Sequence, residues 1–116
     1  MSSLLKKETI DGILELAGGE DLILVEIFKS FLKDANELSE SIKYSADSSD
    51  WEKLKFDVHT LKGLCGTIGA TSLFEVCNEL NNNLKIGNTK FAEELATKVV
   101  LIYEELVTYI NKNYNI

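Results

Sequence analysis

The hydrophobic positions along the chain recur at helical intervals. From Asp21 onward, apolar residues return every three or four positions for more than five turns, which predicts a long amphipathic helix. Three further stretches with this spacing begin at Trp51, at about Ala70 and at Phe91, and a shorter one covers about Ile10 to Ala17. No alternating strand pattern competes with them. The pattern predicts an all-α fold, an antiparallel four-helix bundle with a short additional N-terminal helix that packs across one end.

The residues between these stretches predict where the helices begin and end. The chain has no proline, and its seven glycines are the natural breaks. Ser49 followed by Glu52 is a capping-box pattern, which predicts that the second long helix starts at Asp50 or Trp51. Gly87 suits a left-handed position just after the third long helix. The last apolar stripe fades into the polar C-terminal tail.

Length and composition describe a globular protein. A chain of 116 residues with 45% hydrophobic and 27% charged residues is expected to fold as one domain, residues 1–116. A net charge of -7 argues against nucleic acid or anionic membrane as a partner. Cys65 and Cys77 are too few for a disulfide framework and lack the spacing of a metal site, so we expect no bound metal and a reducing, cytoplasmic setting. No apolar run is long enough to span a bilayer.

The only histidine of the chain, His59, is predicted to face solvent. At about 100° per residue it lies roughly 140° from the apolar stripe of its helix. The same helical rotation places several other residues on its side: Glu52, Lys55, Phe56, Lys62, Gly63 and Gly66.

Gly63 follows His59 by one turn, where any side chain would crowd the imidazole. A glycine inside a helix costs roughly 0.5–1 kcal/mol relative to alanine, so a functional gain is expected to offset it. A bare backbone would let a protein or a phosphoryl group approach the ring, and Lys62, at i+3, could neutralise an anion there. Imidazole is a nucleophile near neutral pH without help from a base. No nucleotide-binding loop accompanies it, so we expect a group carrier without kinase or hydrolase activity of its own.

The order His59-x-Leu61-Lys62-Gly63, followed by Gly69-Ala70, Leu73, Cys77 and Leu80, resembles the signature of histidine-containing phosphotransfer (HPt) domains. The resemblance implies a phosphorelay intermediate: His59 accepts a phosphoryl group from the phospho-aspartate of one receiver domain and passes it to the aspartate of another. It implies that Lys62 stabilises the phosphoryl oxygens and that Gly63 leaves room for them. The protein then needs no cofactor of its own, because Mg²⁺ comes with the partner receiver domain.

The chain departs from the HPt pattern after Leu80. The family often has Glu or Gln where this chain has Asn81, a shorter side chain that is expected to orient the imidazole only through water. The resemblance also predicts a monomer whose receiver-binding surface combines the His59 patch, with Lys55, Phe56 and Gly66, and apolar residues such as Ile13 and Ile23.

Two other functions remain open from the sequence. The first is a helical adaptor that binds a protein partner without phosphotransfer and in which His59 is incidental. The second is the dimerisation fragment of a histidine kinase, which also presents a histidine on a helix bundle. That fragment pairs two helices across a dimer beside an ATP-binding domain, whereas this chain has enough helices to close its own core. Phosphoryl uptake and oligomeric state separate the three.

Overall fold

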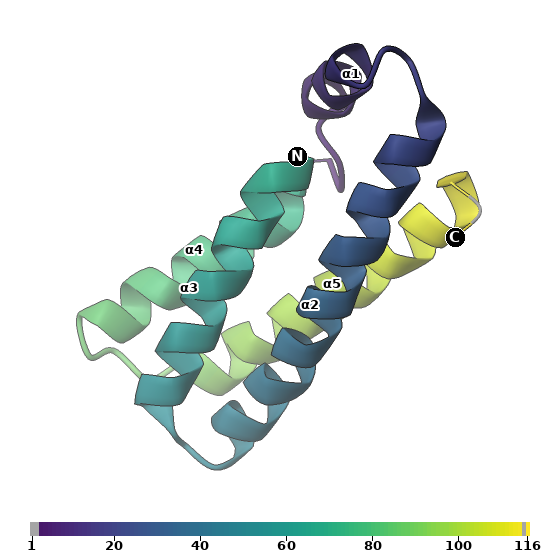
Figure 1. Cartoon of the computed structure of the whole chain (residues 1–116). Helices are drawn as coiled ribbons and strands as arrows, with labels where there is room; N and C mark the ends of the chain where they lie inside the picture. The colour runs from purple at the N-terminus through teal and green to yellow at the C-terminus, as the bar shows by residue number, and fades with distance from the viewer. Residues whose placement is uncertain (1–2, 115) are drawn as a thin grey trace.

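The computed structural model describes residues 3–114 and 116, which form five α-helices and no strand (Figure 1). The helices are α1 (Lys7–Leu16), α2 (Asp21–Asp47), α3 (Trp51–Ile68), α4 (Thr71–Lys85) and α5 (Ala92–Tyr114). The all-α prediction is confirmed. None of these helices combines the length and the apolar character that crossing a membrane requires.

The four long helices pack side by side in a helical bundle. α3 packs between α2 and α4, and α5 contacts α2 and α4 on their other side. Figure 1 shows that the links between consecutive long helices alternate between the two ends of the bundle. α1 packs on α2 and α3, and lies across the end where α3 turns into α4. The result is an elongated molecule, 45 × 21 × 21 Å, in which one side of α3 is left uncovered.

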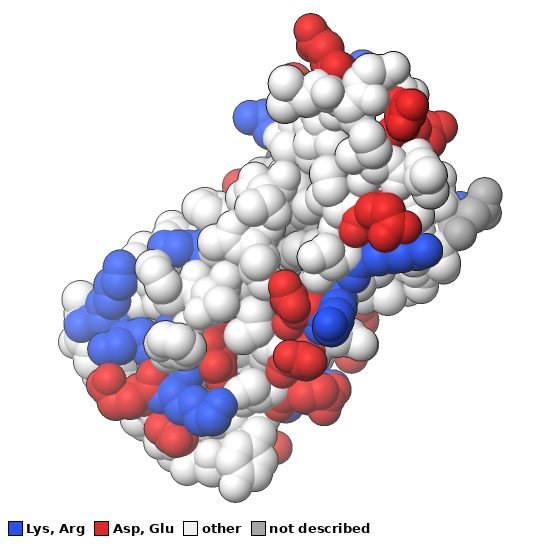
Figure 2. All heavy atoms as spheres, viewed as in Figure 1, with Lys and Arg blue, Asp and Glu red and all other residues white. Residues whose placement is uncertain are grey.

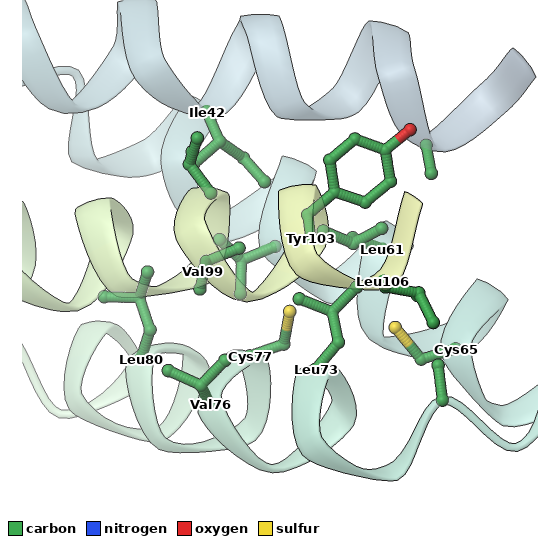
Figure 3. Close-up of a cluster of buried hydrophobic side chains, with 14 of the residues drawn as sticks. Ile42, Leu61, Cys65, Leu73, Val76, Cys77, Leu80, Val99, Tyr103 and Leu106 are labelled. Atoms are coloured by element: carbon green, nitrogen blue, oxygen red, sulfur yellow. The ribbon is translucent and has the colours of Figure 1, made fainter. Parts of the chain in front are cut away.

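The apolar stripes meet in one core. Apolar residues at helical spacing along α3, among them Leu54, Val58 and Leu61, have no exposed surface. Both cysteines point into the same cluster from α3 and α4 (Figure 3) and are free thiols. Hydrogen bonding to the Cys77 side chain, together with burial, raises the pKa of the Cys65 thiol. Cys65 therefore stays protonated, and both buried cysteines act as small core side chains.

The start of α3 differs from the predicted capping box. α3 begins at Trp51, as expected, but Asp50 is the N-cap, and its side chain accepts a hydrogen bond from the backbone N–H of Lys53 at 3.2 Å. Ser49 lies in the turn before it with φ of 56°, a left-handed conformation. The Ser49 prediction is wrong because Asp50 is an equally good cap one residue closer to the helix.

Two helices are longer than the sequence pattern predicts. α1 begins at Lys7 rather than at about Ile10, and α5 continues through the polar tail to Tyr114. The Tyr114 ring packs on Phe28 of α2, with ring centroids 4.7 Å apart. An apolar contact at the last turn of α5 explains why the helix persists among polar residues.

The turn between α3 and α4 requires glycine. Gly69 has φ of +70°, and a Cβ there would lie 2.7 Å from Cβ of Thr9 in α1. Its carbonyl accepts a hydrogen bond from the backbone N–H of Lys6 at 2.7 Å. This close approach fastens the N-terminal segment to the end of α3. Gly87 after α4 also adopts the predicted left-handed conformation, with φ of +75°.

Candidate functional site

His59 is exposed on α3, on the side of the helix opposite the buried stripe. Its neighbour Val58 and the next stripe residue, Leu61, are completely buried, so the core fixes the rotation of α3 about its axis. That rotation directs the imidazole outward, as predicted. The backbone beneath it is regular helix.

A hollow of about 450 Å³ lies beside His59 along the seam between α3 and α4. We call it the histidine hollow. Six residues line it, four from α3 and two from α4: Glu52, Lys55, Phe56, His59, Asn81 and Lys85. The structure thus brings together His59, Lys55, Phe56 and Asn81, which the sequence had singled out. Phe56 is 70% exposed and is not covered by α1.

Asn81 forms part of the wall of the histidine hollow and is completely buried. Its Nδ2 donates a hydrogen bond to the backbone oxygen of Lys55 at 3.3 Å, which joins α4 to α3 one turn before His59. Its Oδ1 has no hydrogen-bond partner among the described residues. A buried acceptor without a donor is unusual in a folded protein and calls for an explanation.

Lysines gather around His59 although the chain as a whole is acidic. Figure 2 shows Lys side chains over the part of the surface formed by the first half of α3 and the end of α4, with acidic residues between them. Lys55 pairs with Glu52 at 3.5 Å. Lys62 and Lys85 take part in no ion pair within residues 3–114 and 116. Lys62 is half-buried on the turn after His59, outside the hollow.

Two glycines leave part of the α3 backbone uncovered beyond His59. Gly63 and Gly66 are exposed, and a Cβ at either position would meet no atom of the described chain within 4 Å. The fold itself therefore does not require glycine at these positions, unlike at Gly69. The prediction that any side chain at position 63 would crowd the imidazole is wrong for a Cβ, which would clear the His59 ring. The open space faces away from the protein, which is what a site for an approaching group or partner needs.

The other side of α3, toward α2, holds a second buried polar group that the sequence analysis missed. Asp57 is 5% exposed, and its Oδ2 accepts hydrogen bonds from Ser41, from Ser45 at 3.5 Å and from Nζ of Lys53 at 3.3 Å. Lys53 also donates to Ser41. The i,i+4 spacing of Lys53 and Asp57 was the available signal, but the two serines come from a distant segment.

Ile13 and Ile23 lie apart from the histidine hollow, on α1 and at the start of α2. Ile13 is half-buried and packs against the core, whereas Ile23 is 41% exposed. Two neighbours that the sequence analysis did not select, Leu16 and Leu22, are 92% and 68% exposed. Their position beside the Gly18-Gly19 break was the signal that could have found them.

The described residues contain no group of three or more His, Cys, Asp and Glu side chains placed to hold a metal ion. The chemistry that the site itself offers is that of one exposed imidazole with cations near it and open space around it. Such an arrangement can hold an anionic group on a ring nitrogen.

The site is thus one exposed histidine on a helical bundle, with lysines and uncovered helix backbone near it. Residues 26–109 match the Hpt domain family, and the chain belongs to that family. Hpt domains carry out histidine phosphotransfer in two-component phosphorelays. A search of curated proteins and a search of solved structures gave no match. The matched segment contains His59 and the whole of α3 and α4.

Proposed function

We propose that this protein is a phosphorelay intermediate in which Nε2 of His59 accepts a phosphoryl group from a receiver-domain phospho-aspartate. The nitrogen lone pair forms a P–N bond as the P–O bond to the aspartate breaks and the carboxylate leaves. A second receiver aspartate reverses these steps and takes the group away. The observation that carries the proposal is the exposure of His59 on α3, within the segment that matches the family.

Lys62 and Gly63 support this chemistry on the turn after His59. The Lys62 ammonium lies at i+3, within reach of an anion attached to the ring. Gly63 leaves open space where the phosphoryl oxygens and the receiver backbone would approach. We assign charge compensation to Lys62 and clearance to Gly63.

Asn81 is the residue that would position the imidazole. Asn81 lines the same hollow as His59 and its Oδ1 has no partner among the described residues, so the Nδ1–H of a neutral imidazole is a donor that would satisfy it. That hydrogen bond, direct or through water, fixes the tautomer in which Nε2 carries the reactive lone pair. The carbonyl oxygen rather than the amide nitrogen is available because Nδ2 is held by Lys55.

The proposed partners are receiver domains, which would supply Mg²⁺ and both the donor and acceptor aspartates. The scaffold is an antiparallel four-helix bundle with α1 across one end, acting as a monomer. The docking surface combines Lys55, Phe56 and Gly66 near His59 with exposed apolar residues at the α1–α2 link, of which Ile23 is a better candidate than the half-buried Ile13. The two free cysteines support a reducing, cytoplasmic compartment.

Transfer from a ³²P-labelled receiver domain in the presence of Mg²⁺ tests the proposal. We expect the wild type to take up label that is labile to acid and stable to base, and His59→Gln to take up none. Because His59 is the only histidine, no other imidazole can replace it. Absence of label on the wild type with several receiver domains would favour the adaptor function instead.

A further inference from the structure

We infer that Lys85, at the end of α4, is a second cation for the phosphoryl group on His59, and that the group rests in the histidine hollow. This inference rests on the proposed phosphotransfer function and adds a residue to it. The sequence resemblance pointed only to Lys62, on the same helix as His59. Lys85 comes from the neighbouring helix and is brought to the site by the fold alone.

The ion pairs around the hollow single out Lys85. Of the two lysines that line it, Lys55 is already paired with Glu52. Lys85 is exposed and takes part in no ion pair within the described residues. Its ammonium group is therefore available to an incoming anion. With Glu52 as the only carboxylate in the lining, two lysines give the hollow a positive balance on a chain of net charge -7.

Asn81 supplies an independent reason to treat the hollow as a binding site. It is completely buried, and its Oδ1 remains without a donor among the described residues. When the imidazole turns toward the hollow and gives Nδ1–H to this oxygen, the group on Nε2 remains among the lysines. In this arrangement Oδ1 of Asn81 binds Nδ1–H of the His59 imidazole, and Lys85 lies near the phosphoryl group on Nε2.

The electrostatic effect follows from the charge that phosphorylation adds. A phosphoryl group carries close to two negative charges near neutral pH, and an unpaired cation nearby stabilises it. Hydrolysis of a phosphoimidazole is promoted by a proton on the ring, which a neighbouring cation disfavours. Lys85 is thus expected to lengthen the lifetime of phosphohistidine.

Lys85 also has a purely structural explanation. It lies in the last turn of α4, where a cation interacts favourably with the helix dipole. That role would change the free energy of unfolding and leave the stability of the P–N bond untouched. The lifetime of the phosphorylated protein is therefore the measurement that separates the two roles.

The experiment uses phosphoramidate, a small donor that places a phosphoryl group on the imidazole with release of ammonia and needs no receiver domain. After removal of the donor, ³¹P NMR follows the loss of phosphohistidine from the wild type, Lys85→Met, Lys85→Arg and Lys98→Met. Lys98 is an exposed lysine on α5, outside the hollow, and controls for the loss of one positive charge.

We expect Lys85→Met to shorten the lifetime about fivefold, Lys85→Arg to stay within about twofold of the wild type, and Lys98→Met to have no effect. Equal lifetimes for Lys85→Met and the wild type, or equal losses for Lys85→Met and Lys98→Met, would overturn the inference while leaving His59 as the carrier. A wild type that accepts no phosphoryl group, from phosphoramidate or from receivers, would overturn both proposals.

Discussion

A buried polar side chain lies on each of the two sides of α3, and the two differ in whether their polar atoms have hydrogen-bond partners. Toward α2, Asp57 receives hydrogen bonds from two serines and a lysine. Toward α4, Asn81 makes one hydrogen bond to the backbone and leaves its Oδ1 without a partner among the described residues. The side with the satisfied group has an acid that these hydrogen bonds hold in place. The side with the unsatisfied group has the histidine.

The difference shows how one helix separates stability from function. A buried charge is tolerated only when donors surround it, so the Asp57 network must be complete for α2 and α3 to pack. An unsatisfied neutral amide costs less, and that cost is acceptable where a ligand or a moving side chain will satisfy it. We interpret the α2 side of α3 as the structural side and the α4 side as the working side.

The largest loss of stability should follow from removing Asp57, the acceptor of the hydrogen-bond network on the α2 side of α3. Asp57→Ala leaves Ser45, which is completely buried, without its acceptor, and we expect it to lower the free energy of unfolding by about 2 kcal/mol. Lys53 is half-exposed and can turn to water, which keeps the loss below that of a fully buried pair. Urea denaturation measures it.

Asp34→Ala is the matched control, because Asp34 is an exposed acid on α2, and its effect should stay within about 0.5 kcal/mol. The phosphohistidine lifetime of folded Asp57→Ala should equal that of the wild type. A shortened lifetime would show that the two sides of α3 are coupled and would break the comparison.

On the working side of α3, a change at Gly63 is expected to alter the rate of phosphotransfer and to have a smaller effect on stability. Gly63→Gln should slow phosphotransfer from a receiver about tenfold, because the new side chain occupies the space through which the phosphoryl group approaches. The same change should stabilise the protein by about 0.5 kcal/mol, since glutamine is the better helix former.

Gly63→Ala sharpens this test. A Cβ at position 63 meets no described atom within 4 Å, so alanine should stabilise α3 and retain most of the transfer rate. Transfer at the wild-type rate in Gly63→Gln would refute the role of Gly63 in clearance. Equal slowing by alanine and glutamine would point to backbone flexibility instead.

The sequence predicted what depends on local spacing. The apolar stripe of α3 was enough to place His59 on the outer surface, and Gly69 and Gly87 follow the ends of α3 and α4 as predicted breaks. The same prediction is wrong for Gly12, Gly63 and Gly66, which lie inside helices. The choice of Asp50 over Ser49 as the cap depended on the conformation of one turn, and the extension of α5 depended on Tyr114 reaching Phe28. Contacts between distant segments leave no such local pattern in one sequence.

The same limit explains which site residues were missed. Lys55, Phe56 and His59 share a helix face, so rotation along α3 groups them. Lys85 joins them only because α4 packs beside α3, and Ser41 meets Asp57 only because α2 does. Asn81 was found by resemblance, but neither resemblance nor periodicity indicates that its Oδ1 would lack a partner.

The smallest effect on the rate, and the most direct test of the unsatisfied side, comes from Asn81. Asn81→Leu removes an acceptor that the fold leaves unused and also the hydrogen bond from Nδ2 to the Lys55 carbonyl, so the free energy of unfolding should fall by about 1 kcal/mol. Phosphorylation of His59 should slow about threefold, because the imidazole loses the group that holds Nδ1–H. The ¹⁵N NMR signals of the single histidine report this tautomer directly, and the Nδ1–H form should decrease in Asn81→Leu.

Asn81→Gln is the conservative variant, because its longer side chain presents the same amide oxygen closer to the ring. It should restore both the Nδ1–H tautomer and the phosphorylation rate. A tautomer ratio that is the same in all three proteins would mean that Asn81 does not orient His59. In that case the unpartnered Oδ1 would have to serve a donor other than the imidazole, and its cost to the fold would need another explanation. If the ratio instead follows the side chain at position 81, the unsatisfied acceptor is the positioning group for His59.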